Sequence, residues 1–147
     1  MGEGAALNDL PRTPNPLVVR ADFKDDNAWH EIERIARSPV GPEGFLAYLE
    51  FLDDRSYDGV GPVELLALTR ARYPHGFVVL ADALAMSHRD HPVLVIDLGE
   101  ERGRSFRAIP SALQSVENNL SIANLDFVDF AEAAEATKDK ILRELTG

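Results

Sequence analysis

The sequence predicts one domain of mixed α/β class, with helices packed on a single-layer mixed sheet of about five strands. Two observations lead to this fold class. Apolar runs typical of strands alternate with segments of helical periodicity in the first half of the chain. Two more apolar runs then flank a charged loop, and two helical segments follow. The predicted order is β-α-β-α-β-β-β-α-α, so crossover connections give parallel strands and the hairpin adds antiparallel ones.

The elements of the first half follow from apolar spacing. Residues 1–16 hold scattered glycine and proline with little periodicity, which predicts a flexible tail before a globular domain over residues 17–147. The β-branched run 17–23 predicts a strand. In residues 25–38, an aspartate cap precedes apolar residues at helical spacing and predicts a helix. The largely apolar run 44–54 predicts a strand covered on both faces.

The next part of the chain, residues 62–110, adds a helix and three strands. Pro62 begins a helix, because its missing N–H is not needed in the first turn. The apolar run 77–86 predicts a buried strand. Two further strands, 91–98 and 105–110, flank the loop GEERGR and predict a hairpin.

Two more helices are predicted after residue 110, one over residues 111–119 and one after Asn124. Residues 111–119 have apolar side chains spaced by three and four. Asn124 is expected to cap the next helix, with Asp126 in its first turn. The segment KDKILREL, 138–145, either continues that helix or frays.

Composition excludes several classes of function. The net charge of −10 argues against nucleic acid as a partner, because that affinity depends on lysine and arginine neutralising phosphates. No run of 18 apolar residues is present, so no membrane partner is expected. The chain has no cysteine, which removes disulfides, thiolate ligands and a thiol nucleophile. The first residues lack the features of a signal peptide, and a cytoplasmic protein is expected.

Aspartates close several of the predicted strands. They are Asp22, Asp53, Asp54, Asp82 and Asp97. Ligands of open α/β sheets bind beyond the carboxyl ends of parallel strands, and converging carboxylates would suit Mg²⁺. Aspartate is also a common helix cap, and an antiparallel strand would carry its aspartate to the opposite edge. Both interpretations stay open.

The run Glu117, Asn118 and Asn119 is the second candidate site. Asparagine is a poor helix former because its amide competes for backbone bonds. One interpretation is that these side chains satisfy backbone groups where a helix ends. The other is that they form the polar face of a pocket, with Glu117 accepting a hydrogen bond from a ligand.

No motif for a phosphate loop or a nucleophile elbow is present, so no cofactor and no catalytic residue is predicted. His88 and His91 have a spacing that suits a metal only on a helix, and Pro92 favours a loop. We therefore predict a non-catalytic module that binds a protein or a small molecule through its loops. The alternative is a small metal-assisted enzyme that uses the strand-end aspartates.

Three stretches carry a resemblance to a known family: LVVRADFKDDNAW, FLDDRSYDG and the run from HPVLVIDL to FVDFAEA. The chain resembles a family of uncharacterised actinobacterial proteins with a domain of unknown function. The resemblance covers residues 16–134, and VENNLSIANLDF and DLGEERGRSFR are its most specific parts. It implies an intracellular single domain from a GC-rich bacterium, and no activity, cofactor or catalytic residue.

Overall fold

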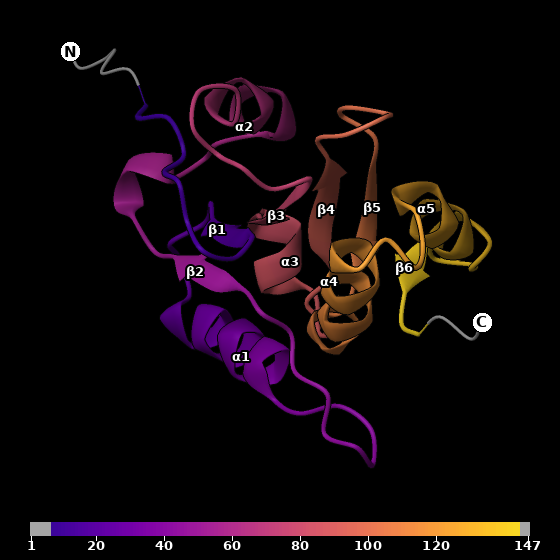
Figure 1. Cartoon of the computed structure of the whole chain (residues 1–147). Coiled ribbons are helices and arrows are strands. Elements are labelled where there is room, and N and C mark those ends of the chain that lie inside the picture. Colours follow the sequence, from indigo (N-terminus) through magenta and orange to yellow (C-terminus); the bar gives the residue numbers. More distant parts are fainter. Residues whose placement is uncertain (1–6, 145–147) are drawn as a thin grey trace.

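A six-stranded mixed sheet forms the centre of the computed structural model, which describes residues 7–144 (Figure 1). The strand order is β2-β1-β3-β4-β5-β6. The strands are β1 (Leu17–Arg20), β2 (Glu50–Leu52), β3 (Phe77–Ala81), β4 (Val93–Asp97), β5 (Ser105–Ala108) and β6 (Ile141–Leu142).

The strand directions define two edges of this sheet. Strand β1 is parallel to β2 and β3, β4 is antiparallel to β3 and β5, and β6 is parallel to β5. We call the edge where β1, β2 and β3 end the carboxyl edge, and the edge where they begin the amino edge. Because β4 is antiparallel, it begins at the carboxyl edge and ends at the amino edge.

Helices cover both faces of the sheet. They are α1 (Asp26–Arg37), α2 (Pro62–Leu68), α3 (Ala83–Ser87), α4 (Leu113–Ser121) and α5 (Phe127–Glu135), with 3-10 turns at Arg55–Tyr57 and Pro110–Ala112. One core cluster holds the apolar side chains of α1, α3, α4 and α5. The other holds those of α2 and of the N-terminal segment, residues 7–16, which precedes β1. In Figure 1, α1 and α2 lie on opposite sides of the sheet.

The apolar strands are buried on both faces, which explains their continuous hydrophobic runs. In β3, Phe77 and Val79 face one core cluster, whereas Val78 and Leu80 face the other. All five residues of β3 are buried. The prediction of a mixed α/β fold with one mixed sheet is therefore confirmed, with six strands in place of about five.

Two predicted strands are shorter than expected. The run 77–86 ends as a strand at Ala81, because the Asp82 carboxylate accepts from the Ala85 amide (3.1 Å) and begins α3. In the run 44–54, only Glu50–Leu52 joins the sheet. The side chain of Tyr48 is 60% exposed, so the expectation of a strand covered on both faces is wrong for the first half of this run.

Both ends of the described chain belong to the fold. The N-terminal segment was expected within a flexible tail over residues 1–16, and residues 1–6 lie outside the described part. Leu10, however, is fully buried, and its amide donates to the Leu68 carbonyl (2.8 Å). Near the other end, the predicted helical segment 138–145 contributes β6 beside β5. No helix within residues 7–144 has the length and apolar character needed to cross a membrane.

Candidate functional site

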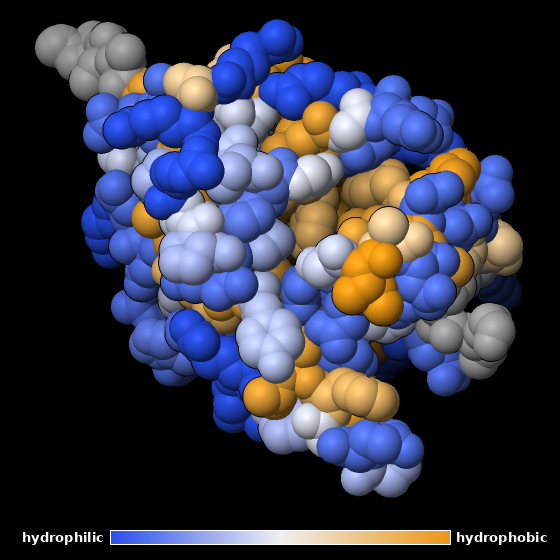
Figure 2. Space-filling view, viewed as in Figure 1, coloured by the Kyte–Doolittle hydropathy of each residue, from blue (hydrophilic) through white to orange (hydrophobic). Residues whose placement is uncertain are grey.

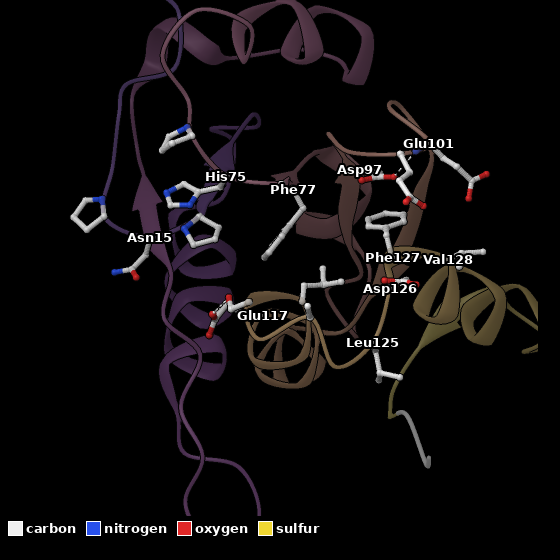
Figure 3. Close-up of a pocket in the computed structure, with 18 residues that line it drawn as sticks. Asn15, His75, Phe77, Asp97, Glu101, Glu117, Leu125, Asp126, Phe127 and Val128 are labelled. Carbon is white, nitrogen blue, oxygen red and sulfur yellow. Dashed lines mark hydrogen bonds between the residues drawn. The ribbon is translucent and has the colours of Figure 1, made fainter.

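A pocket of about 520 Å³ opens at the amino edge of the sheet. Its walls come from the N-terminal segment with the loop before β3, from the end of α4, and from the β4–β5 turn with the start of α5 (Figure 3). The space-filling view shows a recess with apolar residues at its base, and both hydrophilic and hydrophobic residues border its mouth (Figure 2). The volume lies within the range of small-molecule sites.

The first wall is fastened to β1 by a buried tyrosine. The Tyr73 hydroxyl accepts from the Leu17 amide and donates to the Phe77 carbonyl, both at 2.8 Å. Burial raises the pKa of Tyr73, so its hydroxyl stays neutral. The imidazole of His75 meets the Tyr73 ring edge-on, and its Nε2 lies 2.8 Å from the Thr13 carbonyl oxygen. These contacts fix His75 at the pocket wall.

The end of α4 carries a buried glutamate into the lining. Glu117 is 4% exposed, and its carboxylate accepts from the Tyr48 amide (2.8 Å), the Asn118 side-chain amide (2.7 Å) and the Ser121 hydroxyl. The Asn118 amide also donates to the Leu46 carbonyl (2.9 Å). Glu117 and Asn118 therefore hold the loop before β2 against α4.

The third wall begins at Asp97, the last residue of β4. The antiparallel direction of β4 brings this aspartate to the amino edge, where it is 5% exposed. Its carboxylate accepts from the amides of Gly99 (2.8 Å) and Glu101 (2.9 Å), which shapes the β4–β5 turn. Phe127 lines the pocket beside it and packs on Phe106, with ring centroids 5.0 Å apart.

The lining is acidic. It holds five carboxylates and one imidazole, and neither lysine nor arginine; these side chains are Asp97, Glu100, Glu101, Glu117, Asp126 and His75. Glu101 pairs with Arg104 outside the lining (3.0 Å). Within residues 7–144, the two buried carboxylates, Asp97 and Glu117, form no ion pair.

The connection from α4 to α5 closes one side of the pocket with a helix-terminating turn. Ala123 has a left-handed backbone (φ 56°), and its amide donates to the Leu120 carbonyl (3.2 Å). The Asn124 amide donates to the Asn119 carbonyl (3.0 Å). This pair of bonds is a Schellman motif, which satisfies carbonyls at the end of a helix. The Asn119 side chain bonds to the Ser115 carbonyl (2.8 Å) and receives a bond from the Asn124 side chain (2.8 Å).

The prediction that Asn124 caps the following helix is wrong. Asp126 is the N-cap of α5, and its amide donates to the Asp129 carboxylate (2.9 Å). Asn124 instead completes the end of α4, because the left-handed residue before it turns the chain back toward Asn119. Sequence spacing alone does not distinguish an asparagine after one helix from an asparagine before the next.

The predicted site residues divide between the two edges. Glu117 lines the amino-edge pocket, whereas Asn118 and Asn119 bond to nearby groups and do not line it. At the carboxyl edge, the buried Arg20 donates to the Asp22 carbonyl (2.9 Å) and pairs with Asp26 (2.7 Å) and Asp53 (3.4 Å).

Asp54 and Asp82 begin helical turns at the carboxyl edge. The Asp54 carboxylate accepts from the Ser56 amide (2.9 Å), and this bond holds the pKa of Asp54 below its usual value. Asp82 caps α3 and receives two bonds from Arg107, each of 2.8 Å. Burial acts to raise the pKa of Asp82, but the bonds from Arg107 and from the Ala85 amide outweigh it and lower that pKa.

Metal-ligating side chains do not gather in the part of the chain that the structure describes. No group of three or more histidine, aspartate or glutamate residues there could hold a metal ion. His88 Nδ1 accepts from the Asp90 amide (3.0 Å), and His91 Nδ1 lies 2.9 Å from the Ala85 carbonyl oxygen. These histidines therefore make separate local contacts in their loop.

Comparison with known protein families matches residues 15–145 to a family described as a domain of unknown function, DUF6924. The chain belongs to this family. No curated protein matches it. The resemblance to a family with a domain of unknown function is thereby confirmed. All six strands of this DUF6924 domain fall within the matched residues, and so do both edges of the sheet.

Sequence reasoning missed most of the pocket in this DUF6924 domain. No motif in the sequence singles out His75, and the sequence pattern presents Asp97 only as one of several strand-end aspartates. The direction of β4 is the signal that separates Asp97 from the others. The predicted hairpin fixes β4 antiparallel to β5 but not its direction relative to β3, so the sequence pattern does not by itself place Asp97 at the amino edge.

Proposed function

We propose that this DUF6924 domain is a non-catalytic binding module that holds a small molecule in the amino-edge pocket. The observation that carries the proposal is the pocket itself, which combines an apolar base with a few polar groups in fixed positions. Small-molecule sites have this composition, since apolar surface provides affinity and placed polar groups provide orientation.

The polar groups of the lining are suited to positioning. His75 is held by the Thr13 carbonyl, Asp97 by two main-chain amides, and Glu117 by an amide, a side-chain amide and a hydroxyl. Side chains anchored in this way present the same chemistry to every ligand that enters. Fixed groups of this kind orient a ligand by its shape and charge.

The alternative of a metal-assisted enzyme lacks comparable support at the carboxyl edge. The carboxylate of Asp22 accepts from the Lys24 amide (3.0 Å), that of Asp53 pairs with Arg20, and that of Asp54 accepts from the Ser56 amide. Each carboxylate is thus bound to a different group. The proposed site is therefore the pocket at the opposite edge.

The proposal includes a cytoplasmic location in an actinobacterium. The absence of cysteine suits a reducing compartment, and twelve arginines against three lysines suit a GC-rich genome. Fractionation of such a host, with antibodies to this chain, tests the location. Recovery with the cell envelope or in the medium would contradict it.

A fragment screen with a blocked pocket tests the binding function. Gly76 lines the pocket, has no positive φ, and an added Cβ there would meet no atom within 4 Å. Gly76→Phe should therefore fold and fill part of the cavity. The matched control is Val63→Phe, which adds a ring at a position that is 80% exposed on α2.

We expect fragments to bind the natural chain and Val63→Phe, and to lose binding in Gly76→Phe. Ligand-observed NMR on fragment mixtures measures this, and circular dichroism checks that both variants are folded. Fragments that bind all three proteins equally would show that the pocket is not the site. A screen with no bound fragment would also contradict the proposal.

A further inference from the structure

We propose that the ligand of the amino-edge pocket is a small organic cation, an ammonium or guanidinium group on an apolar body. This inference rests on the proposed function and adds the chemical class of the ligand. Three features of the pocket support it: the sign of its charge, the absence of ion pairs within residues 7–144 at its buried carboxylates, and its apolar base.

The sign of the charge disfavours anions. The lining has five carboxylates and neither lysine nor arginine, and the whole chain carries a net charge of −10. The rim carboxylates of Glu100 and Asp126 are exposed, so their field extends to the mouth of the pocket. A phosphate or carboxylate ligand would meet like charge on entry, whereas a cation would be attracted.

The buried carboxylates add a second reason. Buried charges in proteins are normally paired with an opposite charge. This chain follows that rule at the carboxyl edge, where the buried Arg20 pairs with Asp26 and Asp53. At the amino edge, Asp97 and Glu117 are each less than one-tenth exposed, and their partners in the described part of the chain are all uncharged donors. A cation bound in the pocket would supply the missing opposite charge.

The apolar base indicates what carries that charge. Phe77, Leu120 and Phe127 line the pocket beside the carboxylates, and Figure 3 shows Phe77 between Glu117 and the wall that carries Asp97. A bare inorganic cation would leave this surface in contact with water. An amine on an aromatic or aliphatic body covers it, and such burial is favourable.

Three probes with the same aromatic body separate charge from shape. They are 2-phenylethylamine, 2-phenylethanol and 3-phenylpropanoate, titrated into the full chain and followed by ligand-observed NMR or calorimetry. We expect the amine to bind about tenfold tighter than the alcohol, because a charge-assisted bond contributes more than a neutral one. The propanoate should bind most weakly, and added salt should weaken the amine alone.

Two double variants locate the charge. Glu100→Gln with Asp126→Asn removes two charges from the rim, and asparagine still serves as the N-cap of α5. Glu43→Gln with Asp58→Asn removes two exposed charges that do not line the pocket. Both proteins have the same net charge. We expect several-fold weaker amine binding in the rim variant only, with binding of the alcohol unchanged in both.

Each outcome decides the inference. If the alcohol or the propanoate binds as tightly as the amine, the proposal of a cationic ligand is wrong. Whether the pocket binds small molecules at all is then decided separately by fragment binding to Gly76→Phe. Equal weakening in both double variants also overturns it, because the amine would then respond to net charge alone. Failure of all three probes overturns it as well, and the fragment screen then decides separately whether the pocket binds anything.

Discussion

At the carboxyl edge, Asp53 and Asp82 each bind an arginine, whereas at the amino edge Asp97 and Glu117 are held by uncharged donors beside an open pocket. The carboxyl edge is the place where ligands of open parallel sheets usually bind. Here its aspartates begin helical turns or pair with arginines, one of which, Arg20, is buried. The comparison indicates why the strand-end aspartates of the carboxyl edge are not the proposed site: they pair with arginines or accept from nearby amides of the chain.

Two features from the second half of the chain form the pocket at the amino edge. The antiparallel β4 delivers Asp97 to this edge, and the turn between α4 and α5 folds across it. Neither feature belongs to the parallel half of the sheet. The pocket therefore arises where the parallel and antiparallel parts of the fold meet.

The prediction with the largest expected effect concerns Arg20, the buried arginine at the carboxyl edge. The side chain of Arg20 is 3% exposed, and its guanidinium lies 4.3 Å from the centre of the Phe23 ring. We expect Arg20→Ala to lower the free energy of unfolding by about 3 kcal/mol, since it removes buried contacts and charge-assisted bonds. Urea denaturation measures the change.

The control for this prediction is Arg20→Met, which keeps an apolar stem against Phe23 and Trp29. It should lose less than half as much stability as the alanine variant, because long side chains stabilise by packing as well as by charge. A loss below about 0.5 kcal/mol in Arg20→Ala, the level of an ordinary surface change, would show that the carboxyl edge is not organised by this arginine.

The next prediction concerns Glu117, one of the two buried acids at the amino edge. Glu117→Ala leaves the Tyr48 amide without its partner, and we expect a loss of about 2 kcal/mol for unsatisfied groups. Hydrogen exchange of the Tyr48 amide should become faster. Ser121→Ala removes only one of the three bonds to Glu117 and should lose clearly less. Unchanged exchange at Tyr48 would show that the loop is held by other contacts.

The ion pair at Asp82 gives a pH-dependent prediction. Its pKa is lowered in the folded chain, so the pair stabilises the fold above the ordinary carboxyl pKa of about 4 and loses this effect as pH falls. Asp82→Asn keeps the cap of α3 but not the charge facing Arg107, and we expect a loss of roughly 1 to 2 kcal/mol at pH 7. The difference from the natural chain should shrink toward pH 3, as measured by urea unfolding at both values.

The sequence predicted five of the six strands, most helices and the mixed sheet, because these follow from apolar spacing along the chain. It did not predict α3, since residues 83–86 continue the apolar run of β3 with only Asp82 between them. It placed Glu117 in a candidate site but not its neighbours in space. The pocket joins His75, Asp97 and Glu117 from separate elements, and their proximity depends on strand direction and on long-range contacts that local spacing does not encode.

The smallest test concerns the turn that closes the pocket. Ala123 occupies the left-handed position of the Schellman motif at the end of α4, where glycine is preferred because it has no Cβ to clash. We expect Ala123→Gly to raise the free energy of unfolding by about 1 kcal/mol, the strain of an L-residue in this conformation. The flexibility that glycine adds to the unfolded chain would reduce this gain.

Asn124→Ala is the matched change one residue later. A cap at the start of α5 would make this substitution destabilising by about 1 kcal/mol, whereas in the Schellman motif the main chain of Asn124 makes the bond to Asn119. Only one exposed side-chain bond is lost, so we expect a change below about 0.5 kcal/mol. Thermal unfolding measures the change in stability of both variants, Ala123→Gly and Asn124→Ala. A stabilised glycine variant beside a neutral alanine variant would establish that this wall of the pocket is set by the end of α4, and a destabilised glycine variant would place the strain elsewhere.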